Sequence, residues 1–206
     1  MQSTTKPLSS SKDLMNNSSL TRKSWLKDYF SRYQKSIFET DVSEQIIELR
    51  DLVCQLRENS HRIFFAGNGA SASIASHAAV DFSKQARVQA FDFNEPNFIT
   101  AFSNDYGYDN WVAKAIEHRA SKGDAVVLIS SSGESENIVK GAKSAAEKGL
   151  TVVTLTGFKR NNRLRKLSSI DFWVDSRAYN IVECTHMIWL MATVDLLIGN
   201  AEYSVS

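Results

Sequence analysis

The chain has 206 residues, with 24 basic and 23 acidic side chains, and its formal net charge is +1. This balance gives no long-range attraction to nucleic acid, so no nucleic-acid partner is expected. The two cysteines, Cys54 and Cys184, form no CxxC pair, which argues against a disulfide framework or a cysteine zinc site.

The first 20 residues are rich in Ser, Thr, Asn and Lys. Such a composition buries too little apolar surface to offset the entropy of ordering, so it predicts a disordered tail over residues 1–20. This stretch also lacks the apolar core of a secretion signal, and no apolar run in the chain reaches about 18 residues, the length that spans a bilayer. We therefore expect a cytoplasmic protein without a membrane partner.

A helical segment is predicted next, over residues 21–60. Apolar side chains recur at three- and four-residue steps in residues 23–38 and again in residues 42–58, and neither stretch contains Pro or Gly. The first stretch carries more aromatic side chains than one helix-on-sheet contact requires. Large apolar surfaces of this kind usually mark interfaces, so we expect the segment to take part in a homo-oligomer.

From residue 61 onward, short apolar runs alternate with helical stretches. The runs are mostly continuous and rich in Val, Ile or Phe, which is typical of strands buried on both faces of a parallel sheet. They are Ile63–Ala66, Val88–Phe93, Ala125–Ile129, Thr151–Leu155 and Ile170–Val174. This order predicts an α/β fold with right-handed crossovers, which ends in a helix from about Asn180 to Ile198 with Gly199 as its C-cap.

Two loops directly after predicted strands have the composition of an anion site. They are Gly-Asn-Gly-Ala-Ser at residues 67–71 and Ser-Ser-Ser-Gly-Glu-Ser at residues 130–135, and both open helices. A helix N-terminus offers unpaired N–H groups and a partial positive charge, and serine hydroxyls add donors that rotate to fit phosphate oxygens. The alternative is that Ser71 and Ser135 only cap helices and the glycines only turn the chain. Two such loops at equivalent strand ends favour the phosphate site.

A nucleotide site has less support in the same loops. Neither loop contains the GxxxxGK[ST] motif, and Ala72 stands where the third Gly of GxGxxG would be. The loops also lack a basic phosphate ligand, which disfavours a nucleotide-binding flavodoxin-like domain.

Four segments of the chain resemble the signature segments of SIS (sugar isomerase) phosphosugar proteins and, within them, of phosphoheptose isomerases. They are residues 67–71, 103–107, 129–137 and 153–157, in that order. The resemblance extends over about residues 22–200. It implies a flavodoxin-like three-layer α/β/α sandwich with a five-stranded parallel sheet, an SIS domain over residues 61–202, a homotetramer, and a substrate such as sedoheptulose 7-phosphate.

The resemblance also implies which residues bind this phosphorylated sugar. Ser130, Ser132 and Ser135 would hold the phosphate. Asn68, Ser71 and Asp105 would contact the sugar. The full predicted substrate-binding set is Asn68, Gly69, Ser71, Asp105, Ser130, Ser131, Ser132, Ser135, Asn137 and Asn180.

The catalytic positions depart from the family pattern. The family has a His followed four residues later by Glu, and here the pair is His77 and Asp81. On the last helix the family has a Gln and, eight residues on, a His; these positions are Glu183 and Met191. A second family His is matched by His186, and a family Asp three residues before the Gln is Asn180 here. Met cannot transfer a proton at neutral pH and is a poor ligand for hard metals.

The spacing of the titratable residues allows two kinds of chemistry. His77 and Asp81 share a helix face at i,i+4, and Glu183 and His186 share one at i,i+3. If both faces line one cleft, the four residues could carry out aldose–ketose isomerisation, which needs a base and an acid. Alternatively, His77, Asp81 and Glu183 could bind zinc. The simplest alternative is a surface ion pair at His77–Asp81 and a local pair on the last helix.

Two functions follow from these observations. The first is a ketose/aldose phosphate isomerase, in which Glu183 is the base, His77 the acid or a metal ligand oriented by Asp81, and His186 a second choice of acid. No cofactor is required, although zinc is compatible. The second is a non-catalytic phosphosugar-binding regulator or scaffold, similar to the DnaA initiator-associating protein of the SIS family. Met191 favours this second function, because it replaces a His of the family's catalytic pattern.

One basic run remains outside this scheme. Residues 159–166 carry five positive side chains after the predicted fourth strand. They could contact an anionic substrate or a partner, but a solvated basic loop is more common for such a run.

Overall fold

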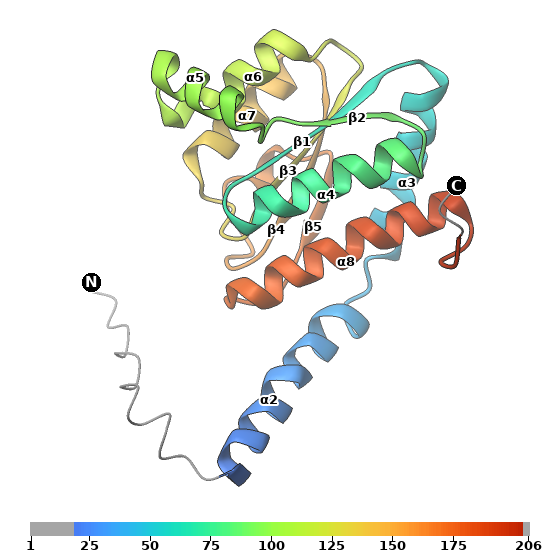
Figure 1. Ribbon diagram of the computed structural model, residues 1–206, viewed down its shortest axis with the longest axis vertical. Helices are drawn as coiled ribbons and strands as arrows, with labels where there is room; N and C mark the ends of the chain where they lie inside the picture. Colours follow the sequence, from blue (N-terminus) through green and yellow to red (C-terminus); the bar gives the residue numbers. More distant parts are fainter. Residues whose placement is uncertain (1–18, 204–206) are drawn as a thin grey trace.

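The computed structural model describes residues 19–203 (Figure 1). The disordered tail predicted over residues 1–20 lies outside the described residues, apart from its last two. Two helices open the described chain, α2 (Ser19–Phe38) and α3 (Ser43–Glu58). Both helices predicted from the apolar spacing are therefore confirmed, and the first begins earlier than expected.

A five-stranded parallel sheet forms the centre of the molecule. All five predicted strands are present, each within two residues of its expected ends, as β1 (Arg62–Gly67), β2 (Gln89–Asp92), β3 (Ala125–Ser130), β4 (Thr151–Thr156) and β5 (Ile170–Trp173). Their order across the sheet is β2-β1-β3-β4-β5. Every residue of β3 is buried, as a continuous apolar run in a central strand predicts.

Helices cover both faces of the sheet and complete the predicted three-layer α/β/α sandwich. On one face, α3, α4 (Ala70–Lys84) and α8 (Tyr179–Ile198) bury their apolar side chains in a single cluster with the strands. On the other, α6 (Trp111–Arg119) and α7 (Glu136–Glu147) form a second cluster, with α5 (Pro96–Tyr106) packed at its edge (Figure 1). The division at residue 60 between a helical segment and the SIS domain stays a prediction, although α3 packs into the first cluster.

The helix α2 extends away from this sandwich and leaves much of its apolar surface uncovered (Figure 1). Trp25, Phe30 and Phe38 are 61%, 62% and 81% exposed. Trp25 stacks on Tyr29 with ring centroids 5.2 Å apart, so the aromatic stripe is ordered along the helix. An exposed stripe of this size fits the interface expected from the sequence.

The last helix, α8, has the length and apolar composition of a membrane span, the one such helix in residues 19–203. It packs against α3 and α4, however, and Trp189, Leu190 and Val194 are buried in the first cluster. Its composition therefore matches that of a core helix. The helix ends as predicted at Gly199, whose φ of 79° is left-handed.

The strand order fixes where a ligand can bind. The chain leaves β1 toward β2 on one side, and leaves β3 toward β4 on the other, so the connections diverge between β1 and β3. These strands pair directly, and Gly67 lies opposite Ile129 at their carboxyl ends. In open α/β sheets of this order, ligands bind in the crevice outside that point. The loops at residues 67–71 and 130–135 both begin there.

Candidate functional site

A small cavity of about 130 Å³ lies where these two loops meet. Serine hydroxyls dominate its lining, and one carboxylate from α8 completes it. The lining residues are Asn68, Ser71, Ile129, Ser130, Ser131, Ser132, Ser135, Tyr179 and Glu183. We call this cavity the serine pocket. It gathers six of the ten predicted substrate-binding residues and the predicted base.

The hydroxyls of the 130–135 loop are tied to one another. Ser130 Oγ and Ser135 Oγ lie 3.1 Å apart, and Ser130 Oγ also accepts a 3.2 Å hydrogen bond from the Gly133 amide. Ser132 Oγ accepts from the Glu134 amide at 3.2 Å. Ser135 occupies the N-cap position of α7 but makes no side-chain cap, so its hydroxyl stays with the pocket. The idea that Ser135 serves only as a helix cap is therefore wrong.

The first loop gives the same result for Ser71. Gly69, with φ at 57°, is the N-cap residue of α4, and Ser71 lies inside the helix, 3% exposed. Ser71 is thus a buried hydroxyl at the cavity wall. Gly69 itself does not line the cavity but sets the turn from which α4 begins.

Gly133 and Asn162 fix the shape of the loop at residues 130–135, which we call the serine loop. Gly133 has φ at 66°, and a Cβ there would meet Asn162 Oδ1 at 2.1 Å, so only glycine fits. Asn162 is wholly buried, and its amide donates to Thr156 Oγ1 at 3.1 Å and to the Lys159 carbonyl at 2.9 Å. The buried amide therefore holds the loop after β4 together, and the Leu164 amide joins this loop to the serine loop by a 3.0 Å hydrogen bond to the Gly133 carbonyl.

A pair of amides closes the side of the pocket next to β1. Asn68 and Asn137 exchange two hydrogen bonds at 3.0 and 2.9 Å, and Tyr108 donates to Asn68 Oδ1 at 3.0 Å. Asn137 is 2% exposed and lies behind Asn68 rather than at the cavity surface. Its structural effect is to orient the Asn68 amide.

Glu183 joins the serine pocket to a second, larger hollow. Ser131 Oγ donates to Glu183 Oε1 at 3.4 Å, which holds the carboxylate at the pocket edge. The second hollow, of about 490 Å³, runs between α4 and α8 and is lined by Glu183, Asn180 and mostly apolar side chains. Asn180 thus lies beside the site in this hollow. Asp105 is exposed at the end of α5, where it accepts a 2.9 Å hydrogen bond from Asn104, and lines neither cavity.

His77 and Asp81 form the expected pair but not the expected cleft. His77 Nε2 and Asp81 Oδ2 lie 3.1 Å apart, and the imidazole is 54% exposed. Neither residue lines the serine pocket or the hollow beside it. The face of α4 that carries them therefore does not meet Glu183 within one chain, because Ser71 and Ile74 occupy the face that does.

His186 lies in the core and not in the pocket, which corrects the expectation that it shares a cleft with Glu183. The imidazole is completely buried, and its Nε2 donates to the Thr156 carbonyl at 3.0 Å. Its Nδ1 has no partner in the described part of the chain. Burial lowers the pKa of His186 to about 4. A neutral imidazole without access to the cavity cannot protonate a substrate there.

The zinc set predicted from the sequence does not assemble in one chain. Within residues 19–203, no three His, Cys, Asp or Glu side chains come together as a metal group. His77 and Asp81 supply two ligands on α4, whereas Glu183 faces hydroxyls on the other side of that helix. Two protein ligands in one place are too few for a closed or catalytic zinc site.

Some residues of the site were missed by the sequence analysis. Tyr179 lines the pocket and packs edge-on against Phe158, with ring centroids 4.9 Å apart. Tyr108 donates a hydrogen bond to Asn68 of the first loop, and Asn162 packs against Gly133 of the serine loop. A tyrosine at the start of the last helix and an Asn-Asn pair in a basic run carry no spacing signal that separates them from ordinary surface residues.

Comparison with known proteins finds a matching family and related sequences. Residues 27–157 match the family model described as SIS domain. A phosphoheptose isomerase of Nitratidesulfovibrio vulgaris is 30% identical over 76% of this chain and 77% of its own length. The phosphoheptose isomerase of Mycobacterium tuberculosis is 33% identical over 64% of this chain and 69% of its own.

Solved structures share the fold. A phosphoheptose isomerase from Neisseria gonorrhoeae superposes with a TM-score of 0.78 at 24% identity, over 87% of this chain and all of the other. One from Francisella tularensis gives a TM-score of 0.76 at 22% identity, over 89% of this chain and all of the other.

Proposed function

Because the chain belongs to the SIS domain family, we propose that it is a phosphosugar isomerase of the phosphoheptose type. The observation that carries this proposal is the serine pocket at the point where the sheet connections diverge. Its hydroxyls and the N-terminus of α7 provide donors for a phosphate group, and Glu183 provides the one carboxylate among the lining residues.

The two cavities suit the two ends of such a substrate. The serine pocket, at about 130 Å³, is smaller than the roughly 300–1,000 Å³ typical of whole ligand sites, so it fits the phosphate end. The sugar chain would then extend past Glu183 into the hollow between α4 and α8, where Asn180 offers a polar contact. We propose ketose phosphates such as sedoheptulose 7-phosphate as the substrate class.

Isomerisation in this pose requires one proton to move between neighbouring carbons. Glu183 takes the proton from the carbon next to the carbonyl, while an acid protonates the carbonyl oxygen and gives an enediol. Return of the proton to the other carbon, with loss of the hydroxyl proton, completes the aldose–ketose exchange. The hydrogen bond from Ser131 positions the Glu183 carboxylate for the first step.

His77 is our choice for the acid, oriented by Asp81. This role requires the homo-oligomer, since His77 does not line the pocket of its own chain. The exposed stripe of α2 supports an oligomer, and the tetramer is our specific proposal. Zinc would likewise need ligands from more than one chain. The proposed location is the cytoplasm, where sugar phosphates are available.

Calorimetry with sedoheptulose 7-phosphate tests the site. Each hydrogen bond to a charged group contributes about 1.5–3 kcal/mol, so the double variant Ser132→Ala, Ser135→Ala should bind well over tenfold more weakly. The control is Ser83→Ala with Ser144→Ala, whose hydroxyls bond only to backbone carbonyls away from the pocket. Unchanged affinity in the first variant, or equal loss in both, would rule the site out.

One observation favours a binding module without turnover as the second candidate. Met191 stands where the family has a His, and Glu183 and Tyr179 are the two titratable side chains that line the serine pocket. A protein that binds the sugar phosphate but does not exchange its carbon-bound proton would be a sensor or scaffold.

A further inference from the structure

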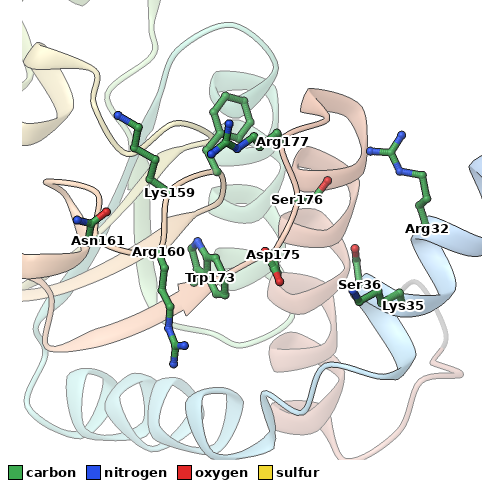
Figure 2. Close-up of a pocket in the computed structure, with 11 residues that line it drawn as sticks. Arg32, Lys35, Ser36, Lys159, Arg160, Asn161, Trp173, Asp175, Ser176 and Arg177 are labelled. Carbon is green, nitrogen blue, oxygen red and sulfur yellow. The ribbon is translucent and has the colours of Figure 1, made fainter.

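A third cavity, separate from the serine pocket and from the hollow beside it, is lined by cationic side chains. It has a volume of about 810 Å³ and lies between α2, the loop after β4 and the segment that joins β5 to α8 (Figure 2). Its cationic residues are Arg32, Lys35, Lys159, Arg160 and Arg177. It shares no lining residue with the serine pocket. We call it the basic pocket.

The positive charge of the basic pocket is not neutralised by the protein. None of its five cations forms an ion pair with a carboxylate in residues 19–203, and Asp175 is the one acidic residue in the lining. Gathering like charges from three distant segments raises the energy of the folded chain unless an anion offsets the repulsion. Elsewhere in the same basic run, Arg163 and Arg165 pair with Glu136 and Asp171. The two cations of residues 159–166 that line the pocket, Lys159 and Arg160, therefore have no carboxylate partner in the described residues.

Packing holds the three segments in place around this cavity. On α2, Ser36 is 7% exposed at the pocket wall, and Tyr33 reaches Cys184 of α8 at 3.7 Å. The Phe158 amide donates to the Ser176 carbonyl at 2.9 Å, which joins the other two segments. The cations therefore line a hollow between segments that pack against one another, rather than independent loops.

Two features decide which anion fits. The pocket has the volume of a whole small-molecule site, and its cations are spread over three walls, so a single phosphate would leave several of them uncontacted. The ring of Trp173 is already covered by Arg160 and Arg165, whose guanidinium carbons lie 5.9 and 5.1 Å from its centroid. Arg165 is paired with Asp171, so the aromatic wall positions one guanidinium group for a ligand, that of Arg160, and a guanidinium can bind phosphate oxygens in pairs.

We propose that the basic pocket binds a small molecule with two linked phosphate groups, such as inorganic pyrophosphate or a nucleoside diphosphate. The site is distinct from the one for the sugar phosphate. The loop that carries Lys159 and Arg160 is also bonded to the serine loop, through the Leu164 amide to the Gly133 carbonyl at 3.0 Å, and buried Asn162 packs against Gly133.

Calorimetry of the full chain with inorganic pyrophosphate tests the proposal. We expect one diphosphate per chain, with affinity that falls as salt rises. The variant Lys159→Gln, Arg177→Gln should bind at least about tenfold more weakly, because two charge-assisted contacts are lost. The control variant Lys84→Gln, Lys143→Gln removes the same charge from exposed positions elsewhere and should stay within about twofold of wild type.

Further titrations separate the basic pocket from the serine pocket and identify the ligand. The serine-pocket variant Ser132→Ala, Ser135→Ala should bind pyrophosphate as wild type does. Tighter binding of ADP or GDP would identify a nucleoside diphosphate, and equal binding would identify the diphosphate group alone; both support the site. The proposal is overturned if pyrophosphate does not bind, if the control weakens binding as much as the pocket variant, if the serine variant abolishes binding, or if an acidic peptide binds more tightly.

Discussion

The serine loop and the two helices that carry the titratable groups are built on different principles. The loop is contiguous in sequence, and its hydroxyls bond to one another and to the backbone within six residues. The titratable groups lie on α4 and α8, and each is held by different neighbours: His77 by Asp81, His186 by the Thr156 carbonyl, and Glu183 by Ser131.

This difference separates binding from proton transfer. The proposed phosphate site is gathered within one chain, because strand ends and helix starts bring its parts together. The proposed proton-transfer site has one group at the pocket, Glu183, and in our proposal the second group, His77, comes from another chain. Apart from the Ser131–Glu183 contact, which joins the two regions, variants in one region should therefore have little effect on the other. The following predictions compare the two regions, from the largest expected effect to the smallest.

Gly133→Ala should disrupt the serine loop most strongly. A Cβ at this position would meet buried Asn162 at 2.1 Å in a backbone conformation with positive φ, so strain and overpacking together should lower the free energy of unfolding by about 2–5 kcal/mol. Denaturant titration at fixed protein concentration measures this.

Gly69→Ala is the matched comparison in the first loop. Gly69 also has positive φ, at 57°, but no atom lies within 4 Å of the position that a Cβ would take, so only the backbone strain of about 1–3 kcal/mol remains. Equal destabilisation by the two substitutions would contradict the role given to Asn162.

Acid should destabilise the chain through His186. Burial lowers its folded pKa to about 4, below the unfolded value near 6.5, so the unfolded state binds more protons between these values. The stability is complete above about pH 6.5 and is lost as pH falls toward 4, by about 2 kcal/mol between roughly pH 7.5 and pH 5. The variant His186→Gln should show a flatter pH dependence over this window. If the free energy of unfolding of this variant depends on pH as steeply as that of wild type, the pH dependence comes from groups other than His186.

Asp81→Asn should have the smallest effect on folding. The His77 side chain is 54% exposed and its pair with Asp81 is an i,i+4 pair on one helix, so the loss of the pair should lower the free energy of unfolding by only about 0.3–0.5 kcal/mol. Turnover should nevertheless fall, because Asp81 orients the proposed acid. A variant with normal turnover would show that the pair is only a surface ion pair.

The fold and the position of the serine loop at a strand end were predictable because their signals are local. Continuous apolar runs mark buried strands, and Gly and Ser directly after a strand mark a helix start, so the structure agrees with both predictions. The burial of His186 was not predictable. Its i,i+3 spacing from Glu183 places both residues on neighbouring parts of α8, but it does not say that His186 faces β4 while Glu183 faces the pocket. Tyr179 and Asn162 were missed because their roles depend on contacts between loops far apart in sequence.

The measurement that tests the central claim most directly is solvent deuterium exchange at the carbon next to the carbonyl of sedoheptulose 7-phosphate. Wild type should exchange this proton, and Glu183→Gln should lose at least about a hundredfold in rate while it still binds the sugar phosphate in calorimetry. Wild-type protein that binds phosphosugars but shows no exchange, with or without zinc, would contradict the isomerase and leave the binding module in its place.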